Sequence, residues 1–329
     1  MMKVLFLWEV PQKLQGYIEK RVDKDVECVF PPSGDTADLI PLAEEVEVMV
    51  GWKPDRELLN AAGKLQLFQN PGVGVQHLTT LFREYPGILL ANSHGNTYFT
   101  AQHAVALLLA LSNKVVLHHD FLRQGAWRTG DEEGASIPLR NRTAGLLGFG
   151  SIGSHVASFL SGWELELIAC KRKISGQKPE ILKKWYGIED LQEFLKQTDF
   201  LIISLPHTPE TEGIIGEGEI ELLGPEGLLI NVGRGPVVNE EALFRALKEK
   251  RIGGAGIDVW YDYDPAPDEE GRKFPYNFLF HELDNVVLSP HRAASPFSDL
   301  ERWGEVIENI NRVARDKLPI NLVNRELGY

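Results

Sequence analysis

Cysteine is nearly absent from this sequence, with only Cys28 and Cys170 among its 329 residues. Two cysteines cannot form a disulfide framework, and this composition suits the reducing environment of the cytoplasm. Long hydrophobic runs are also lacking, because the longest, from Ala104 to Leu111, is far below the roughly 18 residues that span a membrane. The apolar run near the N-terminus is too short for a signal peptide. We therefore expect a cytoplasmic location.

Positive charge is scarce relative to negative charge. The 34 Lys and Arg residues stand against 47 Asp and Glu residues, which gives a net charge of -13. A nucleic-acid-binding protein usually presents a basic face, so we expect no nucleic-acid partner. The length predicts two domains with sizeable cores, and 43% hydrophobic with 25% charged residues is ordinary for a globular protein.

Glycine, in contrast, is concentrated in one informative stretch. An apolar run that starts at Thr143 ends in a G-x-G-x-x-G pattern, and a helical pattern and the alternating strand Leu165–Ala169 follow it. This strand, turn, helix and strand context favours a dinucleotide-binding site over a glycine-rich turn without a ligand. The predicted cofactor-binding residues of the turn are Gly148, Phe149, Gly150, Ser151, Ile152 and Gly153.

Each glycine of the motif has a separate predicted role. Gly148 allows the tight turn, Gly150 lets the backbone approach a pyrophosphate, and Gly153 lets the helix pack close to the strand. The helix N-terminus then offers N–H groups and a positive dipole end to the phosphates.

The acidic residue of an NAD site is missing from the end of the second strand. An Asp or Glu is needed there to hold the ribose 2′-hydroxyl, but the sequence continues with Lys171 and Arg172. A guanidinium can bind a 2′-phosphate through two parallel hydrogen bonds. We therefore predict NADP(H) in preference to NAD(H), with Arg172 as the main contact and Lys171 as the second. The alternative is a solvated basic turn.

Strand and helix patterns alternate in the first part of the chain, up to about residue 97. Strands are expected at residues 3–8, 46–50, 65–69 and 88–92, and helices at 17–22, 39–45, 56–62 and 77–83. This alternation predicts an α/β fold with a parallel sheet and helices on its faces.

The rest of the chain begins with an apolar helix. Residues 100–117 are apolar nearly all round, which predicts one helix that is buried between domains or in a subunit interface. Residues 125–142 have the composition of a surface loop, and the long loop 262–283 is of a kind that is commonly functional. Further strands are expected at 200–204, 228–232, 255–259 and 286–288, and helices at 240–250, with Asn239 as its N-cap, and at 298–315.

Three polar residues follow the predicted strands of this second part. Arg234, Asp258 and His291 each lie at or just after a strand end. Ligands of open α/β sheets bind at the carboxyl ends of the strands, so these side chains should face the glycine turn. An Arg can bind a carboxylate and polarise an adjacent carbonyl, and a His can supply a proton, with an acid keeping it charged. The set suits reduction of a 2-oxo acid.

Five stretches of the sequence together resemble those of one family. They are Gly148–Gly153, Leu205–Thr211, Asn231–Glu240, Ala255–Val259 and Ser289–His291. Through these stretches the sequence resembles the D-isomer-specific 2-hydroxyacid dehydrogenases, which include glyoxylate/hydroxypyruvate reductases. The resemblance covers nearly the whole chain. The resemblance implies a homodimer of chains with two Rossmann-like domains. A flavodoxin-like substrate-binding domain would comprise residues 1–98 and 292–329, and a dinucleotide-binding domain residues 99–291.

The resemblance also implies residue roles. Arg234 would bind the substrate and His291 would be the acid/base, while hydride passes from the nicotinamide. Val73 and Gly74 match a loop whose backbone N–H groups bind the substrate carboxylate, and Asn96 lies near the matching hinge between the domains. The further implied cofactor contacts are Pro206, Thr211, Val232, Gly233, Asp258, on the nicotinamide carboxamide, and His291.

The acidic partner of the histidine is ambiguous. In the family it precedes a proline a few residues after the aspartate at position 258, but this chain carries one extra residue there. Asp264 keeps the acid-before-proline pattern and is the first candidate catalytic partner, and Asp262 is the other. His103 stands where the family has a glutamate-histidine pair, but Gln102 replaces the glutamate, so we assign His103 no chemistry. No spacing suggests a metal site.

The favoured function is NADP(H)-dependent reduction of a small 2-oxo acid, such as glyoxylate or hydroxypyruvate, to a D-2-hydroxy acid. One alternative is an NAD-linked dehydrogenase of formate or another small oxyanion. A second alternative is a catalytically idle, cofactor-sensing regulator on the same scaffold, similar to the C-terminal-binding corepressors. Fold-level likeness does not settle the substrate.

Overall fold

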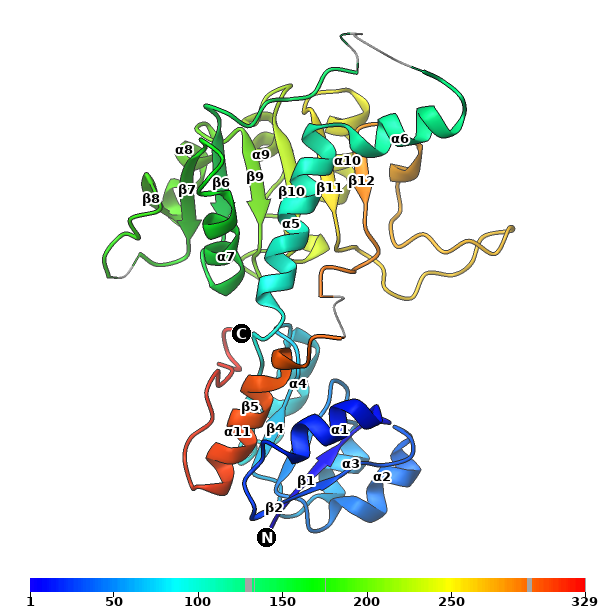
Figure 1. Ribbon diagram of the computed structural model, residues 1–329, viewed down its shortest axis with the longest axis vertical. Coiled ribbons are helices and arrows are strands. Elements are labelled where there is room, and N and C mark those ends of the chain that lie inside the picture. Colours follow the sequence, from blue (N-terminus) through cyan, green and yellow to red (C-terminus); the bar gives the residue numbers. More distant parts are fainter. Residues whose placement is uncertain (128–131, 133, 175, 295–297, 329) are drawn as a thin grey trace. The chain divides into compact units, whose positions relative to one another are not determined.

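The computed structural model describes residues 1–127, 132, 134–174, 176–294 and 298–328. The chain divides into two compact units, one formed by Met1–Asn96 with Pro296–Tyr329 and the other by Thr97–Ser295. These divisions fall at 96/97 and 295/296 rather than at the expected 98/99 and 291/292. Each unit is a parallel sheet with helices on both faces, and Figure 1 shows the path of the chain.

The first unit is built on a five-stranded sheet with the order β2-β1-β3-β4-β5. Its strands are β1 (Met2–Phe6), β2 (Val26–Val29), β3 (Val48–Val50), β4 (Leu67–Gln69) and β5 (Leu89–Ala91). Its helices are α1 (Gln12–Glu19), α2 (Thr36–Ala43), α3 (Arg56–Ala61), α4 (Gln76–Arg83) and α11 (Gly304–Ala314). The strand order 2-1-3-4-5 is the flavodoxin-like order that we expected.

Alternate residues of these strands pack into two different layers. Leu5 and Phe68 face the core beneath α2, α3 and α4, whereas Phe6 and Leu67 face the core beneath α1 and α11. This alternation follows from the two-residue repeat of a strand, and it accounts for short strands that are apolar on both faces.

The end of the chain is held to the first sheet by a buried hydrogen bond. Asn309 on α11 donates from Nδ2 to Gln69 Oε1 on β4 at 2.7 Å, and both side chains are fully buried. Helix α11 thus belongs to the first unit, although it lies near the end of the sequence.

The second unit is a seven-stranded sheet with the order β12-β11-β10-β9-β6-β7-β8. Its strands are β6 (Thr143–Leu147), β7 (Glu166–Lys171), β8 (Lys184–Gly187), β9 (Phe200–Ile203), β10 (Leu228–Asn231), β11 (Gly254–Ile257) and β12 (Val286–Leu288). Its helices are α5 (Thr97–Ser112), α6 (Val115–Arg123), α7 (Ser151–Leu160), α8 (Leu191–Leu195), α9 (Glu217–Glu221) and α10 (Glu240–Lys248).

The strand order of this sheet reverses direction at β6. The chain runs from β6 outward to β7 and β8, then returns to the other side of β6 and adds β9 to β12. The carboxyl ends of β6 and β9 therefore form the topological switch point, where open α/β sheets bind their ligands.

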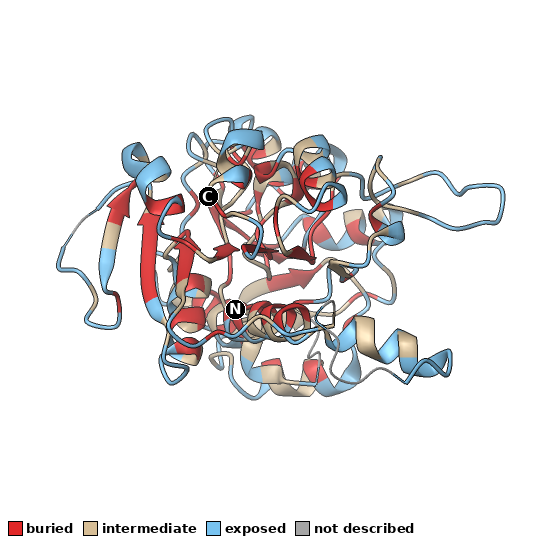
Figure 2. Cartoon of the chain, turned by 90° about the horizontal axis from the view of Figure 1, so that it is seen from above, coloured by how far each residue is buried: buried red, intermediate tan, exposed pale blue. Residues whose placement is uncertain are grey.

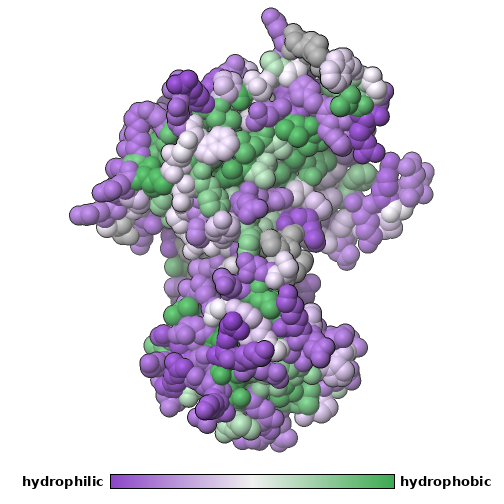
Figure 3. Space-filling view, viewed as in Figure 1, coloured by the Kyte–Doolittle hydropathy of each residue, from purple (hydrophilic) through white to green (hydrophobic). Residues whose placement is uncertain are grey.

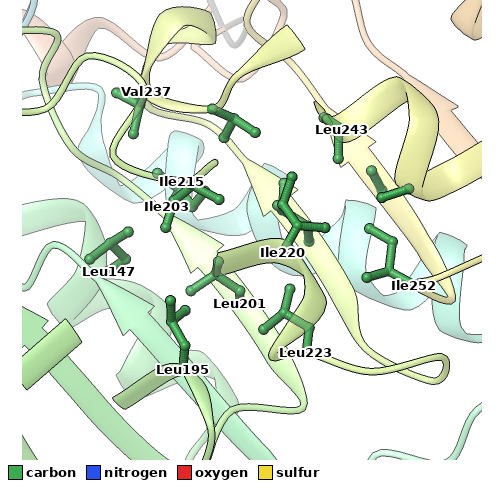
Figure 4. Packing of buried hydrophobic residues seen from close by; sticks show 14 of the residues in the cluster. Leu147, Leu195, Leu201, Ile203, Ile215, Ile220, Leu223, Val237, Leu243 and Ile252 are labelled. Atoms are coloured by element: carbon green, nitrogen blue, oxygen red, sulfur yellow. The ribbon is translucent and has the colours of Figure 1, made fainter. Parts of the chain in front are cut away.

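Two apolar cores cover the faces of the second sheet. Helices α5 and α7 lie on one face and α8, α9 and α10 on the other, as Figure 1 shows. Figure 4 shows part of the second core, where Leu147 and Leu201 from the strands pack with Ile220 and Leu243 from the helices. The central strands β9, β10 and β11 are buried throughout, because helices cover both faces of the sheet, and much of the sheet is red in Figure 2.

The helix expected at residues 100–117 is wrong in its extent, because it is two helices. Lys114 has a left-handed backbone with φ 51°, which ends α5 and starts α6 at Val115. Asn113 Nδ2 donates to Leu109 O at 3.1 Å, and a side chain that binds the backbone in this way competes with the helix ladder.

Two further results concern the segments around these helices. Across the described residues no single helix is long and apolar enough to cross a membrane, and only the bent pair α5 and α6 reaches that length and composition together. Residues 128–131 and 133 of the expected loop 125–142 lie outside the described residues, and residues 134–142 form neither helix nor strand.

Candidate active site

The turn after β6 begins with a glycine in a conformation that other residues rarely adopt. Gly148 has φ 97°, and a Cβ there would lie 3.0 Å from Ser204 Oγ. Ser204 Oγ donates to Gly148 O at 3.1 Å, which ties the turn to the residue after β9. A side chain at position 148 would be both strained and crowded, so the sequence needs glycine for this turn.

The other two glycines of the motif have opposite surroundings. A Cβ at Gly153 would lie 2.3 Å from Gly148 O, so α7 can start this close to the turn only with glycine there. A Cβ at Gly150 would meet no atom within 4 Å. Gly150 is the N-cap of α7, and no side chain among the described residues caps this helix. The positive end of α7 is therefore open beside Gly150, as the binding of a pyrophosphate requires.

Basic residues lie at the end of β7, as the sequence indicates. The Nζ atom of Lys171 lies 5.3 Å from the ring centroid of Trp185 on β8, and Arg172 follows with an exposed side chain. The pKa of Glu210, in the loop after β9, is lowered by a hydrogen bond from Thr208 and also by the charge of Arg172. The charge of Arg172 therefore acts on the loop after β9.

Thr211 closes the loop that follows β9. Its Oγ1 donates to Pro206 O at 2.7 Å and accepts from Thr208 N at 2.8 Å. Both residues that the resemblance assigns to the cofactor in this loop, Pro206 and Thr211, are thus held in one closed turn. This turn follows the strand next to β6, on the same edge as the glycine motif.

Asn231 shapes the turn after β10. Its Oδ1 accepts from Gly233 N at 3.0 Å, and its Nδ2 donates to Arg234 O at 3.0 Å. The turn packs closely on the loop after β9, because a Cβ at Gly233 would lie 2.6 Å from Leu205 O. Val232 is buried beneath it. The buried Asn231 thus fixes the backbone that carries Arg234, a role that sequence reasoning did not assign.

Arg234 has a half-buried guanidinium with an uncompensated charge. Its Nη1 donates to Gly233 O at 2.7 Å, and within the described part of the chain it forms no ion pair. Burial lowers the pKa of Arg234, and the neighbouring phenol of Tyr263 opposes that change. Because an arginine keeps its proton at all ordinary pH values, Arg234 offers a fixed positive charge to an anion.

A buried carboxylate anchors the loop after β12. Asp258 is 1% exposed, and its oxygens accept from Ser289 Oγ at 2.5 Å, Arg292 N at 2.7 Å and Ala293 N at 3.0 Å. His103 Nε2 lies 2.9 Å from Ser289 Oγ and 3.4 Å from Asp258 Oδ1. One carboxylate therefore binds the backbone that follows His291 and the side chain of Ser289, two residues before it.

Sequence reasoning missed the parts that His103 and Ser289 play in this anchor. Both positions stood in stretches that we had compared with the family, but we assigned neither of them a role. The available signal was the aspartate at a strand end, since a carboxylate at so buried a position needs several donors nearby.

The ring of His291 is held by a tyrosine. Tyr263 Oη lies 2.8 Å from His291 Nδ1, and the two rings meet edge to face with centroids 5.4 Å apart. Tyr263 Oη also accepts from Trp260 N at 3.2 Å. Trp260 is itself fixed, because it is buried and its Nε1 donates to Ser289 O at 2.8 Å.

The expected contact of His291 with Asp264, or with Asp262, is a prediction that the structure contradicts. Asp262 Oδ1 accepts from Asp264 N at 2.9 Å, and both carboxylates are exposed. This local turn directs the intervening residue, Tyr263, toward the histidine. The extra residue noted in the sequence therefore changes which side chain reaches Nδ1.

Electrostatic coupling joins His291 to Arg234. Burial lowers the pKa of His291, the charge of Asp258 raises it, and the charge of Arg234 lowers it, with a net shift below the ordinary value. The charge of Arg234 also acts on Tyr263. The charges of Arg234 and Asp258 thus both act on His291 within the second unit, and Tyr263 contacts its ring.

The remaining predicted residues, Val73, Gly74 and Asn96, belong to the first unit. Asn70 Nδ2 donates to Gly72 O at 2.6 Å and to Gly74 O at 3.1 Å, while Asn92 Nδ2 donates to Val73 O at 2.8 Å. In a trans peptide the C=O group and the N–H group of the next residue point in opposite directions. The N–H groups of Val73, Gly74 and Val75 therefore face away from these asparagines.

This loop leads directly into a helix. Helix α4 begins at Gln76, and no side chain in the described ranges caps it at Val75. The N–H groups of Val73 and Gly74 have no hydrogen-bond partner among the described residues. Unpaired N–H groups beside a helix N-terminus form a site suited to a carboxylate. Asn96 is half-buried and ends the first of the two chain segments that form this unit.

The glycine turn yields the first testable prediction. Gly150→Ala should weaken binding of the dinucleotide cofactor by about tenfold or more, corresponding to about 1.4 kcal/mol, because the added methyl enters the space predicted for the pyrophosphate. The melting temperature should not change, since that methyl meets no protein atom. Gly153→Ala is the matched contrast and should lower the melting temperature. Calorimetric titration and thermal unfolding measure both effects, and unchanged cofactor affinity in Gly150→Ala would contradict the assignment.

Comparison with known proteins agrees with this geometry. The family of D-isomer-specific 2-hydroxyacid dehydrogenase NAD-binding domains matches residues 105–293. A glyoxylate reductase of Thermococcus litoralis is 32% identical, with 99% of this chain and 97% of the relative covered. A glyoxylate reductase of Pyrococcus furiosus is 34% identical, with 85% of this chain and 82% of the relative covered.

A solved structure supports the same conclusion over both units. The NADPH-dependent glyoxylate/hydroxypyruvate reductase of Sinorhizobium meliloti, in complex with citrate, superposes with a TM-score of 0.79 at 26% identity, covering 99% of this chain and 98% of that one. Fold, site geometry and these relatives lead to one conclusion. The chain belongs to the D-isomer-specific 2-hydroxyacid dehydrogenases and is an oxidoreductase that uses a nicotinamide cofactor.

Proposed function

We propose that this enzyme reduces a small 2-oxo acid, such as glyoxylate or hydroxypyruvate, to the D-2-hydroxy acid with NADPH. The observation that carries the proposal is the coupling of Arg234, Tyr263 and His291 on the edge of the sheet that bears the glycine turn. The relatives named glyoxylate reductase, from several archaea, support a substrate of this class.

Arg234 and His291 divide the chemistry between them. Arg234 binds the substrate carboxylate and stabilises the charge that develops on the adjacent carbonyl oxygen. His291 gives that oxygen its proton from Nε2, because Nδ1 is already bound to Tyr263. The nicotinamide, when bound, supplies the hydride. Asp258 positions the loop of His291 by accepting hydrogen bonds from Arg292 N and Ala293 N. A hydrogen bond from the nicotinamide carboxamide to Asp258 would be additional to these.

The first unit supplies a second set of donors for the substrate. The N–H groups of Val73 and Gly74 bind the carboxylate from the loop that Asn70 and Asn92 hold in shape. We also assign Asn96 to substrate binding, from its place at the end of the first chain segment of this unit.

Removal of the Arg234 guanidinium tests the proposal. With NADPH and glyoxylate or hydroxypyruvate, Arg234→Leu should lower kcat/KM by about 100- to 1000-fold, as loss of a donor to a developing oxyanion does. Arg234→Lys should recover only part of the rate, because lysine lacks the planar fork. Arg245→Ala, which removes an exposed arginine paired with Glu241 on α10, is the control and should match the parent.

The first measurement is an initial-rate screen of 2-oxo acids, with formate and other small oxyanions included. If no 2-oxo acid supports NADPH oxidation at saturating concentration, the proposal fails and a cofactor-sensing role is favoured. Turnover of formate with NAD alone would indicate the other enzyme class.

The preference for NADPH rests on the end of β7. Arg172 is exposed after this strand, and no carboxylate stands at the strand end to hold a ribose hydroxyl. Lys171 lies over the Trp185 ring, so its charge is also directed to this edge of the sheet. The carboxylate of Glu210 should repel a 2′-phosphate bound to Arg172, because the charges of Glu210 and Arg172 act on each other.

Cofactor kinetics separate these effects. Arg172→Ala should raise KM for NADPH by about 10- to 100-fold, the value of one charge-assisted contact, with little change in KM for NADH. Glu210→Gln should lower KM for NADPH, because a competing negative charge is removed. Lys183→Ala, which breaks an exposed ion pair with Glu166, is the control. A parent enzyme with the lower KM for NADH would refute the preference.

The homodimer that the resemblance implies is supported by α6. This helix contains no buried residue, yet its Val115 is 55% and its Leu122 is 56% exposed, and Trp127 just beyond is 77% exposed. Figure 3 shows apolar side chains over α5 with further ones at α6. Apolar side chains gathered in this way mark an association surface, and we assign it to a second copy of this chain.

Disruption of that surface should be visible in solution. Leu122→Asp should raise the dimer dissociation constant by about 100-fold, since an apolar contact is lost and a charge is left buried. Ile174→Asp, at a position that is 50% exposed elsewhere in the second unit, is the control and should leave the dimer intact. Sedimentation velocity measures both, and a parent protein that is monomeric at micromolar concentration would contradict the assignment.

The cysteines support the proposed cytoplasmic location. Cys28 and Cys170 are both free thiols, and burial raises the pKa of each to about 12. Neither forms a reactive thiolate at neutral pH. Two such thiols suit a reducing compartment, so we place the enzyme in the cytoplasm.

A further inference from the structure

We propose that Tyr263 is a positioning residue that holds the neutral His291 ring with its hydrogen on Nε2, and that it thereby moves the pH range of reduction toward acid. The proposal rests on the proposed function, because that function makes His291 the group that gives the proton. It concerns a phenol at the position where the sequence predicts a carboxylate.

The hydrogen bonds around the phenol leave its own hydrogen free for the histidine. Trp260 N lies 3.2 Å from Tyr263 Oη, and a backbone N–H can only donate, so Oη accepts there. The hydrogen of the phenol is then available for His291 Nδ1, at 2.8 Å. A nitrogen that accepts this bond carries no hydrogen, so the hydrogen of the neutral ring lies on Nε2.

The bonded groups on each side of this pair are fixed. Trp260 packs its ring against Tyr276 at 4.9 Å between centroids and donates from Nε1 to Ser289 O. Ser289 in turn donates to the buried Asp258, which holds the backbone that follows His291. The phenol and the imidazole, 2.8 Å apart, are therefore both connected to Ser289 and Asp258 through hydrogen bonds.

Protonation of His291 disturbs this arrangement. A second ring hydrogen on Nδ1 must be donated to Oη, and the hydrogen of the phenol must then turn away from the ring. Hydrogen bonding to the neutral form disfavours the charged form, so the phenol lowers the pKa of His291. A carboxylate at the same place would raise it, since an opposite charge favours the charged form.

The other charged groups around His291 are few. Burial lowers the pKa of His291, the carboxylate of Asp258 raises it, and the guanidinium of Arg234 lowers it. His103 acts on the same Asp258 carboxylate, and Arg292 binds it through its backbone N–H. Burial also raises the pKa of Tyr263, so the phenol stays neutral throughout the range in which His291 titrates.

The sign of the pH dependence follows from the reaction. During reduction the hydride reaches the carbonyl carbon and the Nε2 proton of the charged ring passes to the carbonyl oxygen. The ring is left neutral with a hydrogen on Nδ1, and proton exchange with solvent then restores the tautomer with the hydrogen on Nε2, which the phenol favours. The rate therefore falls as pH rises through the pKa of His291. Because Tyr263 lowers that pKa, the fall begins at a more acidic pH than it would with a carboxylate partner.

Two substitutions at position 263 test this, and the pH profile of kcat/KM for reduction is the first readout. Tyr263→Phe should move the alkaline limb upward by about half to one pH unit, and Tyr263→Glu by about one to two units, as an adjacent opposite charge does. Tyr263 is 59% exposed, so both variants should fold. If the alkaline limb of the pH profile lay at the same pH in the parent and in both variants, the proposal would be overturned.

The chain provides a matched control in the same loop. Tyr276 Oη lies 3.1 Å from His281 Nδ1, which is a second tyrosine–histidine contact. Tyr276→Phe removes a phenol of the same kind and keeps its ring against Trp260, so the alkaline limb should stay where the parent has it. If Asp264→Asn moved the limb while Tyr263→Phe did not, the carboxylate would be the operating partner and the proposal would be wrong.

A second readout needs no turnover. Nitrogen NMR of histidine-labelled protein, with His291→Asn for assignment, reports both the tautomer and the titration of the ring. We expect the hydrogen on Nε2 in the parent and an upward titration shift in both variants; a hydrogen on Nδ1 would refute the proposal. If these shifts appear but no 2-oxo acid is reduced, the proposed function fails and the positioning role stands.

Discussion

The buried carboxylate of Asp258 is the interaction on which the site depends. Burial alone would raise its pKa, but hydrogen bonds from His103, Ser289 and the backbone after His291 outweigh burial and lower it. The ion therefore persists at 1% exposure. Its bonds to the two backbone N–H groups hold His291 in the left-handed conformation, with φ 54°. That conformation costs about 1–2 kcal/mol, less than two charge-assisted bonds of about 1.5–3 kcal/mol each provide.

Polar side chains also bind loop backbone at other strand ends, where the side chains are amides. Asn231 shapes the turn that carries Arg234, and Asn70 and Asn92 shape the loop that contains Val73 and Gly74. In each case a buried amide binds backbone groups of a loop just after a strand. The loops thus gain fixed geometry from the sheet, and their remaining donors can face a ligand.

Much of this arrangement could be predicted from the sequence, because parallel strands buried on both faces are short apolar runs. All strands of the two sheets except β2 and β8 were expected, and those two are edge strands with exposed or half-buried residues. Their patterns are weak because only part of each strand is covered. The break between α5 and α6 was missed because Lys114 carries no sign of a left-handed backbone in its residue type.

The site was predicted as far as strand ends determine it. Arg234, Asp258 and His291 each follow a strand, so their convergence depends only on topology. The partner of His291 lies in an irregular loop, where one residue more or less decides which side chain faces inward. Sequence spacing cannot determine that choice, because it depends on Asp262 closing a turn with Asp264 and on Trp260 N receiving Tyr263 Oη.

A neutral phenol has an electrostatic consequence that a carboxylate would not have. The substrate and the cofactor are both anions, and this chain has a net charge of -13. Arg234 must therefore attract its ligand against a negative background, and a carboxylate at position 263 would pair with its guanidinium. Tyr263 is bound to His291 yet leaves the charge of Arg234 uncompensated. Among the described residues around His291, the one buried negative charge is thus on Asp258, where it shapes the backbone, and the partner of the histidine ring is neutral.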